Sequence, residues 1–183
     1  MASNILNKDF IRGGDVLLGY SSELREKSAS IQSGYSHAAI CISDSCILES
    51  SRTGVAITNI DKLLEDYGHI AVLRSDGLWS ESRLKILSEF ASENVGKKFN
   101  HFGIGKKYEA RKKEHQNTAM KLVQGYFSGV VPPAPSDREI YFCSELITSA
   151  FIRAKVIDES ASVLFAPETF SPEDIGKDKA FGF

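Results

Sequence analysis

Two residues of this sequence have the types and settings of a catalytic pair, His37 and Cys143. His37 lies in the apolar segment 36–40, and Cys143 opens the apolar segment 143–147. A thiol at the start of a helix lies near the positive end of the helix dipole, and a neighbouring imidazole can accept its proton. Both effects favour the thiolate, which is the nucleophile in covalent acyl transfer. The pair therefore predicts nucleophilic catalysis by cysteine.

Each residue also has a structural interpretation. A cysteine often behaves as a small buried hydrophobe, and a histidine at a strand edge can simply satisfy a hydrogen bond. Cys143 follows the Pro-rich segment 129–136 and comes at the start of its predicted helix, which favours a reactive thiol. Cys41 and Cys46 lie within or beside apolar strand segments, so we expect them to be packing residues.

Glu49 is the candidate partner of His37, because it is a carboxylate in the otherwise apolar segment 47–50. A buried carboxylate needs a partner. If residues 43–45 form a three-residue hairpin loop, Ile42 pairs with Cys46, and Glu49 falls opposite Ala39. It is then diagonal to His37 on the same face, about 7–8 Å away at the backbone. A two-residue loop would turn Glu49 to the other face.

The remaining pattern predicts an α+β fold, in which an antiparallel sheet packs against the helix that begins at Cys143. Strands are expected at 15–20, after the Gly13-Gly14 turn, and at 37–42, 46–50, 54–60 and 70–74, with a polar surface connection over 21–34. One helical turn is expected at 61–66, and helices are expected from Ser80 to just before Gly96 and at 106–127. The helix at Cys143 should be largely buried, because Leu146, Ile147, Ala150, Phe151 and Ala154 share one side.

Length and composition narrow the class of protein. With 183 residues, the chain is expected to form a single domain over 1–183. A net charge of -2 argues against nucleic acid as a partner. The N-terminal residues 1–9 contain no apolar run of signal-peptide length, and no stretch approaches the roughly 18 apolar residues of a membrane span, so a cytoplasmic protein is expected. Three cysteines and four dispersed histidines, with no Cys-x-x-Cys pair, favour free thiols, no metal and no cofactor.

Five short segments resemble the permuted papain-like branch of the NlpC-type cysteine hydrolases, in particular its YiiX-like group. They are residues 14–17, 36–40, 47–50, 142–147 and 171–175, in the order that the family uses. The resemblance implies a circularly permuted papain-like fold. It also implies that Cys143 is the nucleophile, that His37 is the general base, that Glu49 holds the imidazole, and that the Cys143 N–H contributes to the oxyanion hole. The chain departs from the family at Ala39, where glycine is common, and in the charged segment 106–114.

Tyr20 follows the first predicted strand and is a candidate for a second oxyanion donor. Its alternative interpretation is an ordinary half-buried tyrosine. A basic stretch comprises Lys97, Lys98, Lys106, Lys107, Arg111, Lys112 and Lys113. It is expected to be a solvated helix face, with weak contact to an anionic surface as the alternative, although Glu109 and Glu114 weaken that alternative.

These observations predict a peptidase or amidase that acts through a Cys-His-Glu triad and a thioacyl intermediate on a peptide or amide. Two alternatives stay open. One is an acyltransferase, phospholipase or thioesterase that acts on lipid acyl esters, resembling lecithin retinol acyltransferase. The other is a non-catalytic interaction module in which Cys143 is structural.

Overall fold

The fold is built on a five-stranded sheet in the order β4-β3-β2-β1-β5, with all of its neighbours antiparallel. The computed structural model describes residues 7–21, 34–101 and 106–182. The strands are β1 (Val16–Tyr20), β2 (Tyr35–Ser43), β3 (Cys46–Ser51), β4 (Gly54–Asn59) and β5 (His69–Leu73). All five predicted strands are therefore confirmed, while most of the predicted connection 21–34 lies outside the described residues.

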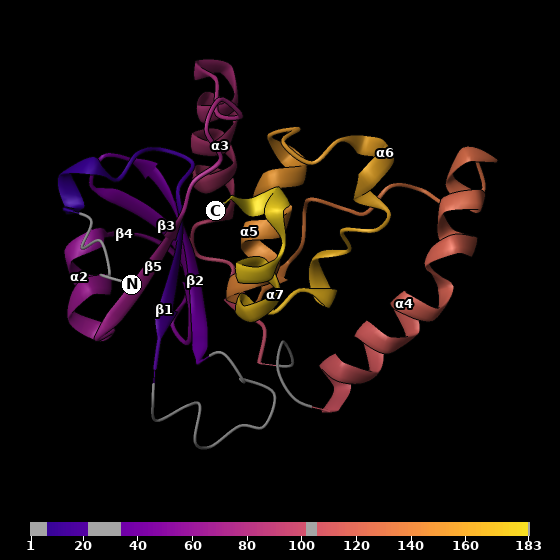
Figure 1. Ribbon diagram of the computed structural model, residues 1–183, viewed down its shortest axis with the longest axis horizontal. Helices are drawn as coiled ribbons and strands as arrows, with labels where there is room; N and C mark the ends of the chain where they lie inside the picture. Colours follow the sequence, from indigo (N-terminus) through magenta and orange to yellow (C-terminus); the bar gives the residue numbers. More distant parts are fainter. Residues whose placement is uncertain (1–6, 22–33, 102–105, 183) are drawn as a thin grey trace, which may run out of the picture.

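Helices α3 and α5 pack against one face of this sheet, and α2 lies on the other side. The helices are α2 (Ile60–Asp66), α3 (Glu81–Asn94), α4 (Lys106–Phe127), α5 (Cys143–Arg153), α6 (Glu159–Ser162) and α7 (Pro172–Lys177). Short 3-10 turns are η1 (Lys8–Phe10), η2 (Pro167–Thr169) and η3 (Lys179–Phe181), and β6 (Lys98–Phe99) pairs in parallel with β7 (Ile140–Tyr141). Figure 1 shows the sheet on one side of α5 and α4 on the other. The α+β arrangement is confirmed.

The β2–β3 hairpin has the predicted pairing of Ala39 with Glu49, but its loop is shorter than predicted. Its loop has two residues, since Ser43 pairs with Cys46. An irregularity between Cys41 and Ser43 takes up one extra residue, so that Ala39 pairs with Glu49 as predicted. The expectation that Ile42 pairs with Cys46 was wrong, but the bulge restores the face on which Glu49 lies.

Alternation along the strands separates two apolar cores. Ala38 and Ile40 face the larger core with α5, α3 and α7, whereas Ala39 faces the smaller core with α2. The buried side of α5 contains all five of the predicted apolar residues, Leu146, Ile147, Ala150, Phe151 and Ala154. By the same alternation, His37 and Glu49 lie on the α2 side of the sheet, and α5 packs on the other side.

Helix ends follow the local signals in the sequence. The Ser80 hydroxyl accepts the Arg83 N–H at the start of α3, and Gly96 adopts a φ of 86° just beyond its end. Gly14 is required at the predicted turn, because its φ is 91° and a Cβ there would lie 2.3 Å from Cγ of Trp79. Within the described residues, no helix is long and apolar enough to cross a membrane.

Candidate active site

One cavity of about 680 Å³ brings the three predicted catalytic residues together. Cys143, His37 and Glu49 all line it, although they come from α5, β2 and β3. The other lining residues are Ser36, Ser50, Ser51, Arg52, Lys62, Asp66, Tyr67, Phe99, His101 and Phe142. Cys143 is the first residue of α5, so it stands at the end of its layer, where it can meet side chains from the opposite face of the sheet.

The carboxylate of Glu49 holds the imidazole of His37. Glu49 Oε2 lies 2.8 Å from His37 Nε2, and the hydroxyl of Thr58 on β4 donates to Glu49 Oε1 at 2.7 Å. Both members of the pair are buried, with exposed fractions of 7% for His37 and 8% for Glu49. Burial alone would raise the pKa of Glu49, but the hydrogen bonds from His37 and Thr58 outweigh it and lower the pKa. Glu49 is therefore an anion at neutral pH.

His37 is held in its protonated form by its two partners. Burial by itself lowers the pKa of His37, but hydrogen bonds to Cys143 and Glu49 outweigh this effect and raise the pKa to about 9. An imidazolium between a thiol and a carboxylate can stabilise a thiolate and can later release its proton. The arrangement has the chemistry of a cysteine nucleophile with its acid–base partner.

The start of α5 is fixed to the sheet by hydrogen bonds around Cys143. The carbonyl of Tyr141 accepts the Ser50 hydroxyl at 2.7 Å and the Asn100 N–H at 2.8 Å. The buried carboxylate of Glu145 accepts the Phe142 N–H at 2.7 Å and the Asn100 side-chain amide at 2.9 and 3.0 Å. These bonds fix the segment that begins with Cys143, a residue that is only 1% exposed although it lines the cavity. Cys143 is therefore a buried residue at the wall of this cavity.

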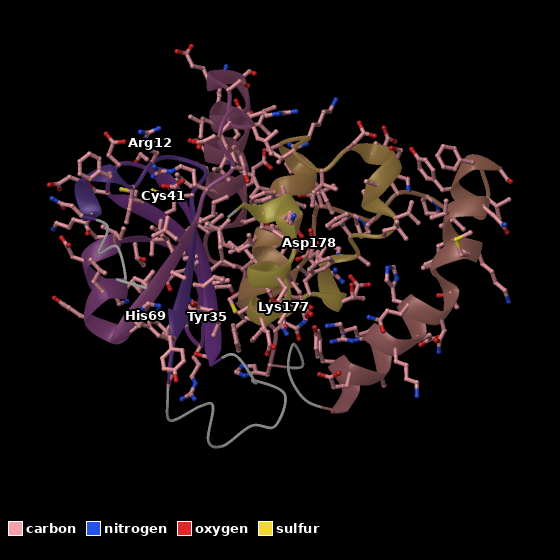
Figure 2. All side chains as sticks on the ribbon, viewed as in Figure 1. Arg12, Tyr35, Cys41, His69, Lys177 and Asp178 are labelled. Atoms are coloured by element: carbon pink, nitrogen blue, oxygen red, sulfur yellow. The ribbon has the colours of Figure 1, made fainter. Side chains whose placement is uncertain are left out.

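Cys41 has the setting expected of a packing residue. It is buried, its thiol donates to the carbonyl of Ser43 at 2.7 Å, and burial with the charge of Asp15 raises its pKa to about 12. Figure 2 shows Cys41 at the end of the sheet opposite Tyr35, and Tyr35 begins the strand that carries His37. Cys46 is half-buried, and all three cysteines are free.

Tyr20 packs edge-on against Tyr35 and His69, with ring centroids 6.3 and 6.2 Å apart. Those two side chains lie together at one end of the sheet (Figure 2). Tyr20 is not among the residues that line the cavity of Cys143. Its role as an oxyanion donor stays a prediction.

The predicted basic stretch is partly neutralised by acidic neighbours. Lys112 forms an ion pair with Asp174, at the start of α7. Lys113 is exposed, and the side chains of Lys106 and Lys107 lie outside the described residues. Contact with an anionic surface stays a prediction.

Several residues that shape the site had no clear signal in the sequence. Thr58 and Ser50 are small polar residues of strands, and Tyr67 stands in a polar stretch after α2. Glu145 could have been found, because an acidic residue three positions after the helix cap is a known capping pattern. Within the described residues, no group of three or more His, Cys, Asp or Glu side chains is arranged to hold a metal ion.

The comparisons with known proteins agree with this arrangement. Residues 11–115 match a family described as permuted papain-like amidase enzyme, YaeF/YiiX, C92 family. The crystal structure of metalloprotein YiiX from Escherichia coli O157:H7 is similar, with a TM-score of 0.51, 16% identity, and 78% of this chain and 68% of that chain covered. A search of curated proteins found no match. The family match includes His37 and Glu49 but ends before Cys143, whose place in the site therefore depends on the geometry.

Proposed function

Because this chain belongs to the permuted papain-like amidase family, we propose that it hydrolyses amide bonds with Cys143 as nucleophile, His37 as acid and base, and Glu49 as orienting group. The observation that carries the proposal is the chain of contacts from Cys143 through His37 to Glu49 inside one cavity. His37 precedes Cys143 in the sequence, which is consistent with a permuted papain-like fold.

Acylation begins when the Cys143 thiolate attacks the carbonyl carbon of the amide, and the carbonyl electrons move to the oxygen. The backbone N–H of Cys143, at the start of α5, donates to this oxyanion. Because Glu49 contacts Nε2 of His37, Nδ1 is the ring nitrogen left for the thiol and the substrate. His37 gives its proton to the leaving nitrogen, the C–N bond breaks, and an amine leaves a thioester on Cys143.

Deacylation reverses the proton transfer. Neutral His37 removes a proton from water, and the hydroxide attacks the thioester carbon. The C–S bond breaks, the carboxylic acid is released, and Cys143 again carries the negative charge beside protonated His37. Glu49 keeps the imidazole in one orientation through both steps and stabilises its positive charge.

A panel of activated amides and esters tests this proposal by intact-mass and peptide-mapping mass spectrometry. We expect a single acyl adduct on Cys143 that accumulates with esters, and that is absent from Cys143→Ala and greatly reduced in His37→Ala. Cys46→Ala is the matched control, since it removes a half-buried thiol outside the cavity, and it should acylate normally. Equal acylation of Cys46 and Cys143 would contradict the proposal.

Lipid acyl esters are the second candidate substrates, because aromatic rings form part of the cavity wall. Phe99, Phe142 and Tyr67 line the cavity beside Cys143 and offer apolar surface to an acyl chain. Release of fatty acid from phospholipid vesicles, with no amine released from peptides, would favour this candidate. Release of amine alone would favour the amidase.

A further inference from the structure

The ring of Tyr67 stacks beside the His37 imidazole in a parallel, offset arrangement. The two ring centroids are 5.5 Å apart and the rings are nearly parallel, with an interplanar angle of 6°. Tyr67 directly follows α2, and its backbone N–H donates to the Leu63 carbonyl, which fixes its place at the end of that helix. It lines the same cavity as His37 and Cys143. The imidazole is thus held at Nε2 by Glu49 and on one face by Tyr67.

The space for this ring is provided by Gly19. Gly19 is the β1 partner of His37 in the sheet. A Cβ at Gly19 would lie 2.8 Å from both Cγ and Cδ1 of Tyr67, closer than real Cβ contacts. Gly19 is not among the described glycines with a positive φ, so an alanine there would change the space and not the backbone preference. The ring of Tyr67 therefore rests directly on the β1 backbone, beside His37.

Stacking of this kind favours the protonated imidazole, because the face of an aromatic ring is electronegative. Burial, together with the charges of Cys143 and Glu49, raises the pKa of Tyr67, so its phenol stays neutral. Within the part of the chain that the structure describes, the charged or titratable groups that face His37 are Glu49 from β3, Cys143 from α5 and Tyr67 itself. Arg52, Lys62, Asp66 and His101 line the rest of the cavity.

We propose that Tyr67 is a positioning residue, whose ring, resting on Gly19, holds the His37 imidazole in the orientation that meets Cys143 and Glu49 and stabilises its protonated form. This inference rests on the proposed function, in which His37 transfers the proton. It adds Tyr67 and Gly19 to the residues that position the imidazole of His37.

The test is the protonation of His37, followed by NMR of the imidazole nitrogens in ¹⁵N-histidine protein between pH 6 and 11. Tyr67→Phe keeps the ring and should titrate like the unaltered protein. Tyr67→Leu keeps the site apolar but removes the stack, so the proton affinity of His37 should fall about three- to tenfold. With a cleavable substrate, the decline of turnover at high pH should begin at a lower pH in Tyr67→Leu, by the amount that corresponds to this loss of proton affinity.

Gly19→Ala should displace the ring of Tyr67 without changing that residue, because the added Cβ would clash with the ring. It should lower the proton affinity of His37 in the same direction, and should have much less effect when combined with Tyr67→Leu, because the clash is then relieved. Gly68→Ala is the matched control, since a Cβ at Gly68 would meet nothing within 4 Å. If Gly19→Ala does not fold, the comparison of Tyr67→Phe with Tyr67→Leu still decides.

The inference is overturned if Tyr67→Leu leaves the titration of His37 unchanged, or if Tyr67→Phe alters it as much as Tyr67→Leu. Cys143→Ala tests the proposed function separately. It should lower the proton affinity of His37, because the hydrogen bond to the thiolate is lost. If Cys143→Ala has no effect, the pairing of Cys143 with His37 fails, whatever Tyr67 does.

Discussion

Glu49→Gln removes the charge beside His37 and keeps the shape of the side chain. His37 Nε2 and Glu49 Oε2 are 2.8 Å apart, and the two side chains are only 9% and 10% exposed, so water screens the pair little. A hydrogen bond to a charged group contributes about 1.5–3 kcal/mol. Since one pKa unit corresponds to about 1.4 kcal/mol, the pKa of His37 should fall by about one to two units.

The sign of the effect on stability follows from the raised pKa of His37. The imidazole has a pKa of 6.5 ordinarily and about 9 in the folded protein. Its interactions therefore contribute stability that is fully present below pH 6.5 and is lost as the pH rises through 9. Glu49→Gln should reduce the free energy of unfolding at pH 6 by about 1.5–3 kcal/mol and by much less at pH 10.

Urea unfolding at pH 6, 8 and 10, with the NMR titration of His37, measures both effects. Thr58→Val is the matched variant, because it removes only the second hydrogen bond to Glu49 and keeps the negative charge, so it should change the pKa of His37 much less than Glu49→Gln does. If Glu49→Gln leaves both the titration and the unfolding free energy unchanged, the carboxylate does not hold the imidazole, and the reasoning is refuted.

Three further predictions concern pH, thiol selectivity and the anchoring of α5. Turnover should decline as the pH rises through about 9, because His37 then loses the proton that it gives to the leaving group. A pH–rate profile from pH 6 to 11 measures this decline. A rate that stays constant up to pH 11 would contradict the prediction. Iodoacetamide at pH 8 should label Cys143 and leave Cys41 unlabelled, because a pKa of about 12 keeps the Cys41 thiol neutral. Peptide mapping measures the extent of labelling at each cysteine. Preferential labelling of Cys41 would contradict the assignment of Cys143 as the reactive thiol. Glu145→Ala should lower the free energy of unfolding by about 2–5 kcal/mol, because the Phe142 N–H and the Asn100 amide lose their acceptor. Asn100→Ala should lower the free energy of unfolding by less. Urea unfolding curves that overlay those of the unaltered protein would disprove this prediction.

The sequence alone was enough to predict the strands and the helices that carry the site. The apolar alternation of 37–42 and 46–50 and the apolar side of 143–154 are local patterns, and the structure has β2, β3 and α5 there. The partnership of His37 and Glu49 was also accessible, because a carboxylate inside an apolar strand needs a nearby cation. The expected three-residue loop was wrong, because the loop has two residues, but the bulge before Ser43 restored the predicted pairing of Glu49 with Ala39.

The resemblance to a family supplied what local patterns could not, namely that Cys143 and His37 meet although 105 intervening residues separate them. The tertiary structure then decided how they meet. Cys143 is the first residue of α5 and lines one cavity with His37 and Glu49. The segment just before it is held by hydrogen bonds that involve Ser50, Asn100 and Glu145. These are contacts between segments distant in sequence, and no local periodicity encodes them.

The roles of Tyr67 and Gly19 also could not be predicted from local sequence patterns. Nothing in the sequence near Tyr67 distinguishes it from a surface tyrosine, and Gly19 is one small residue in an apolar strand. Their roles arise only when β1 pairs with β2 and α2 returns over the sheet, which places a ring on the one strand position without a side chain beside His37. The sequence determined which groups could do the chemistry, and the packing of distant segments decided which neighbours hold them in place.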